Sequence, residues 1–278
     1  PTEALDSGAL IRMVVHGDRG ALIHDLKVAG QSFFAATLNG KRAAVDQVDR
    51  CVSQVADEAA RRIGAPSLLW GGYRKRGESG DQWFHHGDGG LPPAEYPVSP
   101  GREAGSRSVP EPSADLGRKA LDLADLHFVG LYHDDRLVWR ADLFDAPVLG
   151  PFFQRVTPES RRQGYNQVIQ QVSMDAHRIR QLLDLTRSSR LDRLVIDVAR
   201  GAIYVLPLED REYSLVGVTL VQTQVDEADQ KLTALRDTLA GAFGPGALRV
   251  RPGIARERYG SLGAGVSPPP SAISMAVA

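Results

Sequence analysis

The sequence predicts an α+β protein of two small domains, and three observations lead to this class. Apolar stretches of strand length alternate with amphipathic stretches of helix length. Residues 87–112 are dense in Gly, Pro and Ser and have no apolar period, which is typical of a linker. The 278 residues, 42% of them hydrophobic, suffice for two cores. We therefore expect a small α+β domain at 5–86, a linker at 87–112, a second domain at 113–258 and a flexible tail at 259–278.

The composition narrows the functional classes. Lys and Arg number 33 against 34 Asp and Glu, so the sequence does not predict a broad basic face or a nucleic-acid partner. The single cysteine, Cys51, excludes a disulfide within the chain and fits a reducing compartment. No stretch approaches 18 apolar residues, and the first residues lack the pattern of a signal peptide. We expect a cytoplasmic protein without a membrane span, without a cofactor and without a fixed-period repeat.

The first predicted domain centres on a helix in "KRAAVDQVDRCVSQVADEAARRIGAP". Valines at three- and four-residue spacing form its apolar stripe, and Asp49 is expected among the residues that face away from that stripe. Gly64 ends the helix. Before it, "QSFFAATLNG" predicts a strand, and after it "PSLLWGGYRKRG" and "DQWFHH" predict a hairpin. The leading stretch, 9–30, fits either a helix or strands.

The second predicted domain begins with a short helix at 113–126 and continues with two strands within 126–143. These strands flank a turn that contains Asp134 and Asp135. Residues 158–185 carry a single apolar stripe and predict one long helix. Three strands follow at 194–198, 202–206 and 213–221, and the spacing of apolar residues from Val225 onward predicts a last helix.

This order, α-β-β-α-β-β-β-α, resembles the roadblock/dynein light chain family over 113–242, and profilin-like and longin-like domains share much of it. The resemblance rests on this order, on the pattern of apolar and polar residues in "RLVIDVARGAIYVLPLEDREYSLVGVTL" and on the amphipathic helix after it. The resemblance implies a five-stranded antiparallel sheet with a long helix. It also implies a non-enzymatic interaction or scaffold protein, including regulators of small Ras-like GTPases and structural subunits of larger assemblies.

Family members pair through the long helix and the strand after it, so the resemblance implies a homodimer. The strand 194–198 is apolar on both faces and would be hazardous as a bare edge. Pairing of two copies would cover this strand and the helix stripe together. The predicted interface residues are Val172, Ile179, Leu183, Leu194, Ile196 and Val198.

The stretch "DQWFHHGDGG" raises an alternative function. Alternation along a strand places His85 and His86 on opposite faces, so the pair more readily ends a strand than binds one metal ion. A bend at Gly87 would nevertheless bring both histidines together with Asp81 and Asp88. The alternative to a non-enzymatic protein is therefore a metal-dependent hydrolase or an enzyme accessory subunit. The sequence predicts no catalytic or cofactor-binding residue beyond this cluster.

Overall fold

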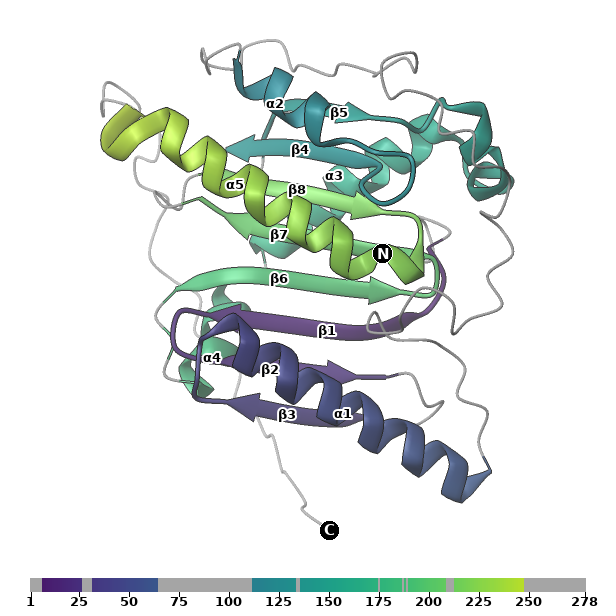
Figure 1. Ribbon diagram of the computed structural model, residues 1–278, viewed down its shortest axis with the longest axis vertical. Helices are drawn as coiled ribbons and strands as arrows, with labels where there is room; N and C mark the ends of the chain where they lie inside the picture. Colours follow the sequence, from purple (N-terminus) through teal and green to yellow (C-terminus); the bar gives the residue numbers. More distant parts are fainter. Residues whose placement is uncertain are drawn as a thin grey trace, which may run out of the picture.

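The computed structural model describes residues 7–26, 32–64, 112–133, 136–174, 176–186, 188, 190–208 and 213–247. In these ranges the chain forms one mixed helix-and-sheet structure around an eight-stranded sheet (Figure 1). The strands lie in the order β3-β2-β1-β6-β7-β8-β4-β5, and every neighbouring pair is antiparallel.

The N-terminal part is a meander of three strands followed by a helix. Its elements are β1 (Leu10–Gly17), β2 (Ala21–Asp25), β3 (Phe33–Thr37) and α1 (Arg42–Ile63). The described part of the leading stretch, 9–26, which fitted a helix or strands, therefore contains two strands. A Cβ on Gly20 would lie 2.2 Å from the carbonyl oxygen of Thr37, so the turn between β1 and β2 requires glycine. Gly64 ends α1 in the left-handed conformation, with φ of 66°, as the sequence predicts.

The C-terminal part follows the predicted order α-β-β-α-β-β-β-α. Its elements are α2 (Pro112–Ala120), β4 (Phe128–His133), β5 (Arg136–Asp142), the short 3-10 helix η3 (Pro147–Phe153), α3 (Pro158–Met174), α4 (Ala176–Leu185), β6 (Leu191–Val198), β7 (Gly201–Pro207), β8 (Tyr213–Thr219), the 3-10 helix η4 (Gln222–Gln224) and α5 (Val225–Ala247). The predicted long helix corresponds to α3 and α4, on either side of residue 175, which lies outside the described residues.

The predicted number of strands in the sheet was wrong, because the sheet has eight strands rather than five. β1 pairs with β6 from Leu10 opposite Val198 to Gly17 opposite Leu191. This pairing joins the N-terminal meander to the C-terminal strands in one sheet. β6 is mostly buried and has a neighbour on each side, β1 and β7, so it is an interior strand.

Helices cover both faces of this sheet. Figure 1 shows α1, α2 and α5 on one face and α3 and α4 on the other. A single hydrophobic cluster runs through both parts, from Val14 and Ile23 to Leu239. The predicted linker (except Pro112) and tail fall outside the described residues, so the division into two domains stays a prediction. None of the helices within the described ranges is long and apolar enough to cross a membrane.

A buried histidine connects the start of β4 to the end of β8. The Nδ1 atom of His127 accepts a hydrogen bond from the backbone N–H of Leu220 at 3.2 Å. Nε2 lies 3.1 Å from the carbonyl oxygen of Leu123, to which it donates. Both contacts suit the neutral ring, because a proton on Nδ1 would face an N–H donor. Burial lowers the pKa of His127 to about 4.

We predict that the protein loses stability in mild acid because of His127. Its lowered pKa in the folded state means that the unfolded chain binds the proton first. The neutral His127 side chain therefore makes its full contribution to the free energy of unfolding above a pH of about 6.5. That contribution decreases as the pH falls toward 4, by at most about 1.4 kcal/mol per pH unit. Urea unfolding between pH 7 and 5 should show a smaller acid-dependent loss in His127→Gln than in the wild type. An NMR titration that places the pKa of His127 at or above 6.5 would contradict this prediction.

Candidate interaction surface and the polar cluster behind it

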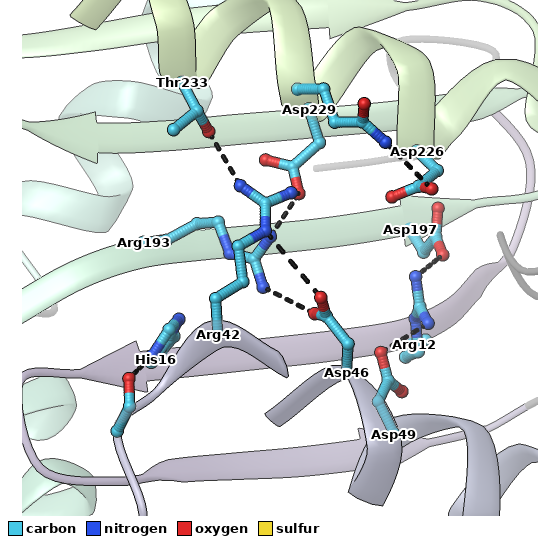
Figure 2. Close-up of polar contacts among 12 residues, drawn as sticks. Arg12, His16, Arg42, Asp46, Asp49, Arg193, Asp197, Asp226, Asp229 and Thr233 are labelled. Atoms are coloured by element: carbon cyan, nitrogen blue, oxygen red, sulfur yellow. Dashed lines mark hydrogen bonds and ion pairs between the residues drawn. The ribbon is translucent and has the colours of Figure 1, made fainter. Parts of the chain in front are cut away.

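A cluster of arginines and aspartates lies where β1 meets β6, beneath α1 and α5 (Figure 2). Arg12 of β1 stands at one end. Its guanidinium donates to Asp49 of α1 at 2.6 Å and to Asp197 of β6 at 2.6 Å. All three side chains are almost completely buried. One guanidinium thus connects a helix and two strands, with its partner Asp197 lying 185 residues further along the chain.

The other end of the cluster belongs to β6 and α5. Arg193 donates to Asp229 of α5 and lies 3.5 Å from Asp46 of α1. Arg42 of α1 donates to the same carboxylate of Asp229 at 2.6 Å and to the hydroxyl of Thr233 at 2.9 Å. The two helices are therefore connected both directly and through the sheet, as Figure 2 shows.

The electrostatics of the cluster follow from its burial. Burial raises the pKa of Asp197, and the neighbouring Arg12 guanidinium opposes this rise. Burial likewise lowers the pKa of His16, whose Nε2 lies 2.8 Å from the carbonyl oxygen of Gly40. A cavity of about 20 Å³, which is room for one water molecule, lies among Arg12, Asp49, Arg193 and Asp229. We therefore assign the cluster a structural role: it holds α1 and α5 in position over the sheet.

The outer surface of the N-terminal part differs from this interior. β3 is the last strand of the sheet on that side, and two large apolar side chains, Phe34 and Leu38, are exposed on it or just after it. Val55 and Ile63 are exposed on α1, the helix that packs on β3. Phe33 packs against α1, so Phe34, the next residue of the strand, points to the opposite face of the sheet. The four exposed residues, two on or just after β3 and two on the helix that packs on its other face, are together with the outer edge of β3 called the β3 edge surface below. They are four of the six exposed large hydrophobic residues in the described part of the chain.

The residues predicted to form a dimer interface pack within the chain itself. Leu183, Leu194 and Val198 are buried, and Val172, Ile179 and Ile196 are partly buried against the hydrophobic core. The prediction required a free edge on the strand 194–198, but β1 already pairs with that edge. Self-association as such stays a prediction.

The predicted metal cluster of Asp81, His85, His86 and Asp88 lies outside the described residues. Within the ranges that the structure describes, no group of three or more His, Cys, Asp or Glu side chains is placed to hold a metal ion. The alternative function therefore stays a prediction as well.

Sequence reasoning missed the polar cluster. Asp49 was expected to face away from the apolar stripe of its helix, but it is buried and bonded to Arg12. A signal was present, because Arg12 and Arg193 interrupt otherwise apolar strands. A buried arginine requires carboxylate partners, and a charged residue beside an apolar stripe is a candidate for that role.

Comparison with known proteins shows little similarity. No protein-family model matches the chain, and no curated protein matches its sequence. A solved structure described as the gliding protein MglB of Thermus thermophilus is similar in part, with 15% sequence identity and a TM-score of 0.36. The matched region covers 50% of this chain and 98% of that chain. A similarity of this size does not assign the chain to a family.

We predict that Arg12→Met destabilises the protein by about 3–5 kcal/mol, because it leaves two buried carboxylates without their guanidinium. Adding Asp197→Asn should restore part of the loss, since it removes one of those charges. Arg61 provides the control: its ion pair with Glu58 is exposed, so Arg61→Met should cost less than about 1 kcal/mol. Urea unfolding of the three variants measures these differences. A loss below about 1 kcal/mol in Arg12→Met would show that the cluster does not hold the fold together.

Proposed function

We propose that this protein acts by binding another protein and that the β3 edge surface is the place where it binds. The supporting observation is the exposed apolar surface around an outer strand. Phe34 is 65% exposed and stacks on the ring of His24, with centroids 4.0 Å apart. Leu38 is exposed just after the same strand, and Val55 and Ile63 are exposed on α1, which packs on the face of β3 opposite Phe34. Large exposed apolar side chains beside an outer strand are a feature of interaction sites.

Strand addition is the mode of binding that suits this surface. An outer strand presents backbone N–H and C=O groups that an added strand can pair with. The apolar residues beside the edge would supply the side-chain contacts that such a strand buries. The polar cluster supports this mode indirectly, because it fixes the position of α1 relative to the sheet.

The order of elements over residues 112–247 favours a more specific form of the function. That order is the one for which the resemblance to roadblock-like domains implies a scaffold, a subunit of a larger assembly or a regulator of a small Ras-like GTPase. We propose that the protein has one of these roles. The metal-dependent hydrolase or accessory subunit remains the alternative, and stoichiometric metal that is lost on His85→Ala/His86→Ala would favour it.

Affinity purification from the native cells with three full-length baits tests the proposal. The baits are the wild type, Phe34→Glu and Val148→Glu. Val148 is an exposed apolar residue on η3, away from β3, so it is a matched control. We expect a protein partner that wild type and Val148→Glu retain and that Phe34→Glu loses. The purified partner should then bind the wild-type chain at least about tenfold more tightly than Phe34→Glu. Equal binding by all three chains would contradict the proposal.

A further inference from the structure

The N-terminal and C-terminal parts contain two copies of one sequence pattern, which is not the fixed-period repeat that the sequence was expected to lack. The stretch "RMVVHGDRGALI" (12–23) aligns with "RLVIDVARGAIY" (193–204) at a separation of 181 positions, with identical residues at five places. Further along, "VDQVDRCV" (45–52) aligns with "VDEADQKL" (225–232) at a separation of 180. The separation is not a period of adjacent units, because β4, β5, α3 and α4 stand between the two copies.

The structure places the repeated residues in equivalent positions. Each copy is a meander of three strands followed by a helix: β1, β2, β3 and α1 in one module, and β6, β7, β8 and α5 in the other. Arg12 bonds to Asp49 of its helix, and its equivalent Arg193 bonds to Asp229 of its own helix. The modules meet where Val14 pairs with its equivalent, Val195. An approximate twofold axis therefore relates the two modules at this pair.

The turns of the two modules are equivalent as well. A Cβ on Gly20 would collide with the carbonyl oxygen of Thr37, and one on Gly201 would collide with that of Thr219. Thr37 and Thr219 are themselves equivalent, and each is followed by leucine. This agreement aligns β3 with β8 at a separation of 182 positions.

The modules differ in what covers their last strand. In the second module β4 pairs with the outer edge of β8, and α2 packs on α5. Residues of the β3 edge surface are exposed, whereas their equivalents in the second module are buried. The exposed fractions are 65% for Phe34 against 0% for Val216, 64% for Leu38 against 1% for Leu220, and 58% for Val55 against 6% for Leu235. The first module thus has the same apolar positions without a cover among the described residues.

We propose that a second copy of this chain covers the β3 edge surface, with the two β3 strands paired antiparallel about Ala35. This inference rests on the proposed function and names its partner. In that register Phe34 of each copy faces Ala36 of the other, so a large side chain meets a small one. The module already pairs with its own repeat through equivalent strands, β1 and β6. A twofold arrangement is also the commonest for soluble proteins, and it covers both copies at once.

Light scattering on the full chain during size-exclusion chromatography tests the proposal. At tens of micromolar we expect the mass of two chains for the wild type and for the control Val148→Glu. Phe34→Glu should weaken the dimer at least about tenfold, because two carboxylates would lie on the same face across the strand pair. A wild-type chain that stays monomeric overturns the proposal, as does a dimer that Phe34→Glu leaves unchanged.

A charge-exchange experiment separates a lost interface from a damaged fold. Phe34→Glu and Phe34→Lys should each be monomeric and folded, and mixing them should restore a dimer, because the two side chains are diagonal neighbours in the proposed register. Failure of the mixture to associate overturns the register. A folded monomer that still needs Phe34 to bind a different protein would overturn this inference and leave the proposed function standing.

Discussion

The pairing of β1 with β6, together with the ion pairs of Arg12, is the contact on which the rest of the structure depends. Burying a guanidinium is unfavourable unless carboxylates surround it, and Arg12 receives one carboxylate from α1 and another from β6. The strands must therefore be in register and the helix in place before the charges are neutralised. Arg193 imposes the same condition from the other strand through Asp229. Together these contacts connect the two repeated modules in one sheet.

That connection determines which strands are outermost in the described part of the sheet. The inner strands of both modules are used in the junction, so β3 and β5 become the outer strands. At β5 the flanking face is covered, because α2 packs on it and Gly117 of α2 lies against the ring of Trp139. At β3 the flanking apolar residues are exposed. The proposed binding function follows from this difference between the two outer strands.

Local patterns were sufficient to predict most elements but not how they assemble. The apolar periods of residues 112–247 predicted the correct order of helices and strands, because each element there has a clear period of its own. The leading stretch, 9–30, could not be assigned as helix or strand from the sequence, because Arg12 and His16 interrupt its apolar pattern. The strand count was wrong because β1 pairs with a strand far along the chain, which no local period reveals. Asp49 was predicted to face away from the core because its partner, Arg12, lies on another element and is not visible in the pattern of the helix.

The central claim is that the two modules form one cooperative structure through β1 and β6, and hydrogen exchange of the full chain tests it most directly. If the claim holds, the backbone amides of 10–17 and 191–198 should exchange through the same opening and show equal free energies of protection. Both should also lose protection together in Arg12→Met. Exchange of 10–17 that is much faster than that of 191–198 would contradict the account, because it would mean that the N-terminal module opens independently of the rest of the sheet.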